Sequence, residues 1–225
     1  MSNQFAKINN FIEDILYVDR SVEETMKIYS EWARNYNEHA EHGQFINMPK
    51  LLAREFGKLN LPKNVRILDV GAGTGLLGTF LHEIGYENID ALDGSQEMLD
   101  RAKSLNGVYR NFINALVKVG QRLPIEDKTY DVALMSAVVC PSHISVEAYG
   151  EIVRIVKSGG VIGWIKRVNE AFSKNSNEYR NGAYENLLKK YEINGLWTPI
   201  NSYCPAVIEN LMAGTNGEIY FMRVI

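Results

Sequence analysis

The feature that most constrains this chain is a glycine-rich stretch that begins at Asp69 and reads Asp-Val-Gly-Ala-Gly-Thr-Gly. It ends a short, largely apolar run from Val65 to Val70, of the kind that is buried on both faces of a parallel sheet. Apolar residues then recur at helical spacing from Leu76 to Ile84. The stretch therefore predicts a strand, a tight turn and an amphipathic helix. Such a turn lies at the carboxyl end of a strand, where open α/β sheets bind their ligands.

A second expected strand follows, and an acidic residue stands at its end. Residues 89–92 read as the neighbouring strand, which Asp93 closes, and Gly94-Ser95 opens a helix that carries Met98. A carboxylate at the end of the neighbouring strand can accept both hydroxyls of a ribose. Taken alone, Asp93 could equally be a helix cap.

Two ligand classes use a turn of this kind. Dinucleotides favour Gly-x-Gly-x-x-Gly, but here the third glycine, Gly75, comes one place early and Leu76 takes the expected site. Asp-x-Gly-x-Gly-x-Gly and Leu-Asp-Gly-Ser-x-x-Met-Leu resemble instead the first two motifs of class I S-adenosylmethionine-dependent methyltransferases. Further matches at residues 108–109, 120–124 and 195–197 resemble the methyltransferase-like proteins of the Williams–Beuren syndrome region.

The resemblance implies a fold and a division of the chain. The expected fold is α/β, a three-layer sandwich with a seven-stranded, mostly parallel, Rossmann-like sheet whose last strand is antiparallel, and N-terminal lid helices. Residues 1–60 are expected to form the helical lid, and residues 61–225 one compact cofactor-binding domain. Besides the two strands above, strands are expected at 108–116, 132–139, 161–165, 197–203 and 217–225. Helices are expected at 1–17, from 21 through Tyr36, at 47–59, at 145–156 with a glycine stop at 157–160, and at 175–193.

The lid expectation rests on an aromatic segment. Ser21 to Glu24 form a capping box, and the helix after it carries Tyr-x-x-Trp-Ala-x-x-Tyr from Tyr29 to Tyr36. This segment resembles the lid that precedes the first motif in many small-molecule methyltransferases, although Ser30 and Asn37 replace the usual acids. The alternative is an aromatic stripe packed on the core.

The resemblance also implies the cofactor, S-adenosylmethionine, and the residues that bind it. No acid stands near Asn114, where the family often binds the adenine amino group, so neighbouring backbone groups or the Asn114 amide are expected to substitute. The expected cofactor-binding residues are Tyr29, Trp32, Tyr36, Asp69, Gly71, Ala72, Gly73, Asp93, Gly94, Ser95, Met98, Ala115, Leu116 and Ser136.

The expected reaction is direct in-line methyl transfer to a small molecule, in which alignment supplies most of the rate. A general base is needed only if the acceptor must lose a proton. No catalytic residue is fixed by the sequence; His143 and Tyr36 are the candidates, and Tyr36, His143 and Arg167 are the candidate substrate contacts. The cysteines, Cys140 and Cys204, lack metal-ligand spacing, and Cys140 reads as a small buried hydrophobe.

Composition limits the partners. A net charge of −3 without a basic block disfavours nucleic acid. No signal peptide or membrane-length apolar run is evident, so a cytoplasmic protein is expected. Two other functions remain open, a non-catalytic cofactor-binding protein and a nicotinamide-dependent oxidoreductase. The displaced glycine and the absence of a Tyr-x-x-x-Lys pair stand against the oxidoreductase.

Overall fold

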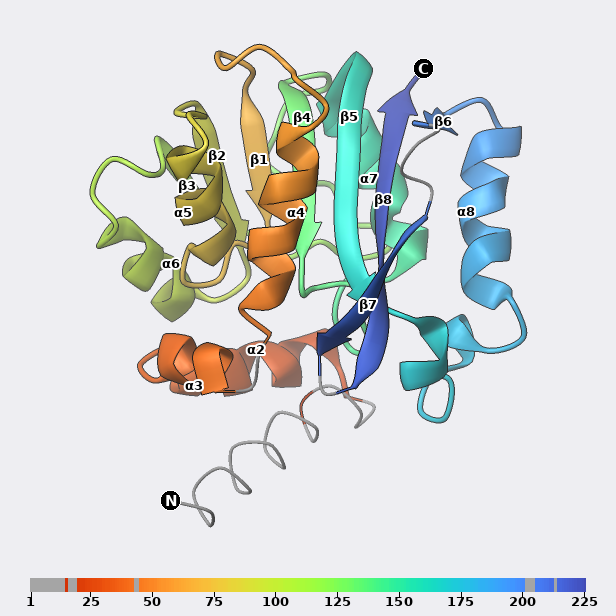
Figure 1. Ribbon diagram of the computed structural model, residues 1–225, viewed down its shortest axis with the longest axis horizontal. Helices are drawn as coiled ribbons and strands as arrows, with labels where there is room; N and C mark the ends of the chain where they lie inside the picture. The colour runs from red at the N-terminus through yellow and green to blue at the C-terminus, as the bar shows by residue number, and fades with distance from the viewer. Residues whose placement is uncertain (1–14, 16–19, 43–44, 201–204, 213) are drawn as a thin grey trace.

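The computed structural model describes residues 15, 20–42, 45–200, 205–212 and 214–225. It is an α/β fold in which helices cover both faces of one twisted, mostly parallel sheet (Figure 1). The helix expected at residues 1–17 lies outside the described residues except for Ile15, which is helical and buried.

The sheet has eight strands in the order β3-β2-β1-β4-β5-β8-β6, with β7 paired to β8. The strands are β1 (Ile67–Val70), β2 (Ile89–Asp93), β3 (Asn111–Asn114), β4 (Tyr130–Ser136), β5 (Val156–Arg167), β6 (Trp197–Pro199), β7 (Ala206–Met212) and β8 (Thr215–Val224). The first five run parallel to one another, and β8 is antiparallel to each of its partners β5, β6 and β7.

Successive strand residues supply two separate cores, because side chains alternate between the faces of a sheet. Ile67, Val132 and Leu134 pack on the side of α4 (Asn47–Gly57), α5 (Leu76–Glu83) and α6 (Gln96–Lys103). Leu68 and Met135 pack on the side of α7 (Tyr149–Ile155) and α8 (Ala183–Ile193). Both strand faces are therefore buried, as the run from Val65 to Val70 predicted.

The parallel register brings the carboxyl ends of the central strands to one edge. Val70 lies opposite both Leu92 and Met135, so the turns after β1, β2 and β4 meet there. Two helices, α2 (Val22–Trp32) and α3 (Tyr36–His42), run across this edge (Figure 1). Ser21 forms the expected capping box with Glu24 at the start of α2.

Several expected boundaries were wrong. The aromatic segment is not one helix, because a turn at 33–35 separates α2 from α3. The sheet has eight strands rather than seven, because β7 was not predicted. Residues 157–160 are not a helix stop but part of β5, and α7 ends at Ile155. The last long helix begins at Ala183 rather than 175, after Gly182 with φ +74°.

Among the described residues, none of the helices has the length and apolar character needed to cross a bilayer. The same residues contain no group of three or more His, Cys, Asp or Glu side chains placed to hold a metal ion.

Candidate functional site

The glycine turn leaves β1 in a conformation that ordinary side chains avoid. Gly71 has φ +71°, and a Cβ there would lie 2.4 Å from Cγ1 of Val138, so the turn packs tightly against the segment after β4. Gly73 has φ +55°, but no atom of the described residues, apart from its chain neighbours, lies within 4 Å of the place where its Cβ would be. The turn is thus closed at its base and open at its tip.

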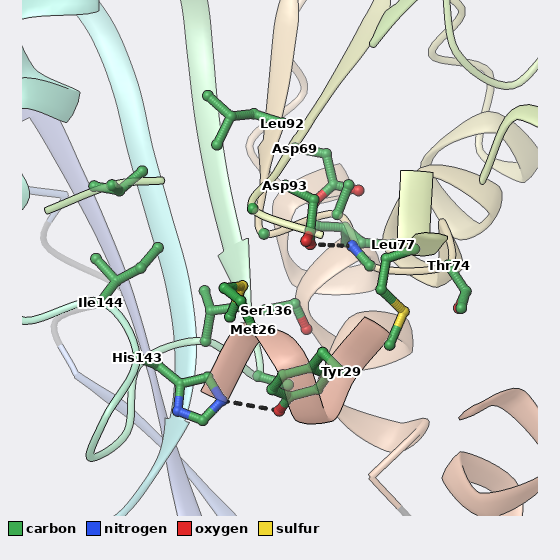
Figure 2. A pocket seen from close by; sticks show the side chains of 18 of the residues that line it. Met26, Tyr29, Asp69, Thr74, Leu77, Leu92, Asp93, Ser136, His143 and Ile144 are labelled. Atoms are coloured by element: carbon green, nitrogen blue, oxygen red, sulfur yellow. Dashed lines mark hydrogen bonds between the residues drawn. The ribbon is translucent and has the colours of Figure 1, made fainter. Parts of the chain in front are cut away.

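Asp93 holds this turn in place from the end of β2. Its carboxylate accepts the Gly73 N–H at 2.8 Å (Figure 2). It also accepts the Ser95 N–H at 2.8 Å. Burial raises the pKa of Asp93, whereas these backbone donors act in the opposite direction. Each carboxylate oxygen has two lone pairs, so each can accept one further hydrogen bond from a ligand.

A second carboxyl group lies behind the turn. Asp69, at 1% exposure, accepts a 2.6 Å hydrogen bond from the Tyr109 hydroxyl, which in turn accepts the Gly78 N–H. Burial raises the pKa of Asp69 to about 7, and the nearby Asp93 charge acts in the same direction. Tyr109 therefore joins the segment before β3 to the start of α5 and to β1.

These residues enclose a first cavity with an empty volume of about 900 Å³, open to solvent. Twelve of the fourteen expected cofactor-binding residues line it, namely Tyr29, Tyr36, Asp69, Gly71, Ala72, Gly73, Asp93, Gly94, Met98, Ala115, Leu116 and Ser136. Two carboxyl groups face this space, and no Lys or Arg lines it among the described residues. The cavity is therefore suited to a cationic ligand.

The other expected cofactor residues lie beside the cavity. Ser95 caps α6, because its hydroxyl accepts the Met98 N–H, and it also contacts the Ser30 hydroxyl at 2.9 Å. Trp32 donates from Nε1 to His39 and lines a different space. The Asn114 amide donates to the Asp93 carbonyl oxygen rather than lining the cavity.

Ser30 and Asn37, which replace the usual acids of the lid pattern, both contact segments that are expected to bind the cofactor. Ser30 on α2 meets Ser95 at the start of α6, and Asn37 on α3 accepts a 2.5 Å hydrogen bond from the Thr74 hydroxyl. Shorter polar side chains at these positions therefore tie α2 and α3 to α6 and to the glycine turn.

His143 belongs to the segment after β4 and lines the first cavity. Its Nε2 lies 2.8 Å from the Tyr29 hydroxyl (Figure 2). Its Nδ1 lies 2.8 Å from the Pro141 carbonyl oxygen. The edge of the His143 ring meets the Tyr29 ring. Burial lowers the pKa of His143. The sequence singled out both residues but gave no sign of the contact, which joins positions 114 residues apart.

A second cavity of about 490 Å³ adjoins the first. Its lining residues are Ile15, Tyr29, Trp32, Tyr36, Phe45, Met48, Ala137, Val139, Cys140, Lys166, Arg167, Phe172 and Met212. Arg167, a candidate substrate contact, lies here and donates from Nε to the Thr215 hydroxyl. Cys140 is buried, as expected. Sequence reasoning did not find Phe172 and Met212, since they come from distant segments without a motif.

The sequence of this chain is similar to those of known methyltransferases. Residues 68–163 match the family model described as a methyltransferase domain. Methyltransferase-like protein 27 of Homo sapiens is 31% identical over 137 residues, which are 60% of this chain and 52% of that protein. The malonyl-[acyl-carrier protein] O-methyltransferase of Pectobacterium atrosepticum is 28% identical over 116 residues, 52% of this chain and 44% of that protein. The chain thus spans about half the length of these curated relatives.

A solved structure shares the fold. The putative S-adenosyl-L-methionine-dependent methyltransferase from Methanococcus maripaludis superposes with a TM-score of 0.59 at 20% identity, over 85% of this chain and 92% of that one. At this identity the likeness concerns the fold alone.

Proposed function

We propose that the chain is an S-adenosylmethionine-dependent methyltransferase that methylates a small molecule by direct in-line transfer, and the match of residues 68–163 to the methyltransferase-domain model supports this proposal. The observation that carries the proposal is the charge of the first cavity. Asp69 and Asp93 face it, without a lining cation among the described residues. A sulfonium compound is positively charged and suits this environment. The pyrophosphate of a dinucleotide would meet two carboxyl groups, which argues against the oxidoreductase alternative.

Other features of the first cavity fit the same cofactor. The Ser136 hydroxyl is buried and, in the described part of the chain, has no hydrogen-bond partner. A buried polar group of this kind is costly unless a ligand pairs with it. Asp93 retains acceptor capacity for two ribose hydroxyls, and the open tip at Gly73 leaves room for a ligand beside the backbone.

We assign the binding roles as follows. Asp93 holds the ribose; Met98 and Leu116 pack against the adenine, with Ala115 beside them; the turn from Gly71 to Gly73 carries the amino-acid portion. The bound cofactor supplies a methyl group on a positively charged sulfur, which leaves as a neutral thioether. The task of the chain is to align the acceptor with that methyl group and to exclude water.

The lid role belongs, in this proposal, to residues 1–60, and above all to α2 and α3, which lie across the carboxyl ends of the strands. Residues 61–225 carry the cofactor. Tyr36 and Arg167 are proposed substrate contacts because both line the second cavity. We propose a cytoplasmic location from the cysteine content, and the net charge of −3 disfavours a nucleic-acid acceptor.

Calorimetric titration tests the cofactor assignment. The wild-type protein is expected to bind S-adenosylmethionine and not NADH, and Asp93→Asn is expected to weaken that binding. Asp100→Asn is the matched control, because Asp100 is an exposed acid on α6 that pairs with Lys103. The absence of both binding heat and a thermal shift at millimolar S-adenosylmethionine would refute the proposal.

Catalysis is tested separately from binding. Labelled methyl groups from S-adenosylmethionine are expected to appear in small molecules of a cell extract when the enzyme is added. Binding without any transfer would favour the non-catalytic alternative.

A further inference from the structure

The two cavities share one wall. Tyr29, Tyr36, Phe45 and Ala137 line both of them, so the spaces adjoin across these four residues. If the first cavity holds the cofactor, as proposed above, the second is the space from which an acceptor can reach the methyl group. The inference below rests on that proposed function.

The lining of the second cavity restricts what it can hold. Its walls are mainly aromatic and aliphatic, including Trp32, Met48, Phe172 and Met212, and no Asp or Glu lines it among the described residues. Both lining cations already have partners: the Lys166 ammonium is engaged by Glu218 at 2.6 Å and Asn169 at 2.6 Å, and Arg167 donates from Nε to the Thr215 hydroxyl at 2.8 Å. The space therefore favours an apolar molecule that contains an aromatic ring or a group of similar size.

The contacts of His143 fix its tautomer. The Pro141 carbonyl oxygen can only accept, so Nδ1 of His143 carries the hydrogen and donates to it. Nε2 then has a free lone pair, which accepts the Tyr29 hydroxyl. The imidazole is therefore oriented to take one proton at Nε2, and that proton reaches it through Tyr29.

The groups that face this pair favour a neutral resting state. The Cys140 sulfur lies 3.2 Å from Nδ1, and burial raises the pKa of its thiol, so it carries no charge at neutral pH. Tyr29 faces Tyr36 and the more distant Asp93, and burial raises its pKa too. The low pKa of His143 keeps the imidazole unprotonated and able to act as a base.

We propose that the second cavity binds an apolar, ring-containing acceptor with a hydroxyl nucleophile, and that Tyr29 relays the proton of this hydroxyl to Nε2 of His143. The acceptor oxygen bonds to the methyl carbon as the carbon–sulfur bond breaks, and the sulfur keeps the electron pair. The hydroxyl proton passes to the Tyr29 oxygen while the proton of Tyr29 moves to His143. The positive charge lost at sulfur reappears on the imidazolium, which releases its proton to solvent when product leaves.

The test uses naphthol as the hydroxyl probe and naphthoic acid as a probe that needs no base. Labelled methyl transfer from S-adenosylmethionine is measured for the wild-type protein, Tyr29→Phe and His143→Gln. Gln at position 143 can still accept a hydrogen bond but is not basic. His82→Gln is the control, because His82 is an exposed histidine on α5 outside both cavities.

We expect transfer to naphthol, with kcat reduced about 100-fold or more in His143→Gln and also reduced in Tyr29→Phe. His82→Gln should match the wild type in kcat and in the dissociation constant of S-adenosylmethionine. The kcat of every variant is measured at saturating S-adenosylmethionine, because Tyr29 and His143 also line the first cavity. At pH values above the pKa of naphthol, the acceptor ionises by itself, so His143→Gln should recover much of its rate. A merely structural role of His143 would not produce this pH-dependent recovery.

Three outcomes would overturn the inference while leaving the proposed function standing. They are cofactor binding without binding or methylation of naphthol, a preference for naphthoic acid, and a naphthol rate that does not depend on His143. A wild-type protein that fails to bind S-adenosylmethionine would overturn the proposed function and this inference together.

Discussion

Replacement of Asp69 by Asn is expected to make the protein without cofactor more stable at alkaline pH. Asp69 is buried behind the glycine turn, where the Tyr109 hydroxyl donates a hydrogen bond to it. Burial raises its pKa to about 7. An Asn side chain can accept the same hydrogen bond through its amide oxygen and has no proton to lose.

The magnitude follows from proton linkage. Between the unfolded pKa of Asp, about 3.9, and the folded value of about 7, the folded protein keeps a proton that the unfolded chain has lost. The free energy of unfolding therefore falls as pH rises through this window, by about 4 kcal/mol in full. About half of that loss, roughly 2 kcal/mol, falls between pH 5.5 and pH 8.5.

Urea unfolding at pH 5.5 and pH 8.5 measures this effect. The stability advantage of Asp69→Asn over the wild type should grow by about 2 kcal/mol between the two pH values. Asp100→Asn is the control, because the pKa of Asp100 is lowered and that group is ionised at both pH values. Its difference from the wild type should therefore stay constant.

A constant or shrinking advantage of Asp69→Asn would refute this reasoning. It would mean that Asp69 ionises in the folded protein as readily as in water, contrary to its burial.

Three further predictions concern single contacts. Asp93→Ala should weaken binding of S-adenosylmethionine by about 1.5–3 kcal/mol in calorimetry, because hydrogen bonds to a carboxylate are lost; an unchanged dissociation constant would contradict its placement. Gly78→Ala should destabilise the fold by about 1–3 kcal/mol in urea unfolding, because its Cβ would lie 2.2 Å from the Tyr109 hydroxyl; wild-type stability would contradict that packing. Lys166→Met should cost about 2–4 kcal/mol by the same measurement, because Glu218 loses its ion-pair partner; adding Glu218→Gln should recover part of the loss.

The sequence predicted those parts of the fold that depend on neighbouring residues. The glycine turn after Val70, the acid at Asp93 and the capping box at Ser21 are local patterns, and the structure has each of them. The helix stop expected at residues 157–160 was wrong because a tertiary contact decides the structure there. A Cβ at Gly160 would lie 2.7 Å from the Asp131 carbonyl oxygen, so this glycine serves a close approach to a neighbouring segment rather than a helix end.

The candidate site also has residues that local sequence motifs indicated and contacts that they did not. Residues within the motifs, such as Gly73 and Met98, line the first cavity, and their expected contacts with the cofactor stay a prediction. The hydrogen bonds from Tyr109 to Asp69 and from Tyr29 to His143 join residues 40 and 114 positions apart. No local pattern encodes such contacts, so they became visible only once the chain was folded.

The conformation of Ala137 places backbone strain in the wall that the two cavities share. Ala137 has φ +59°, and it lines both spaces. A residue other than glycine costs about 1–2 kcal/mol in this left-handed conformation, and β-branched residues are rarely found there. Substitution by glycine would remove this strain and one methyl group from the shared wall. A single position therefore sets both the local backbone energy and the separation of the two spaces.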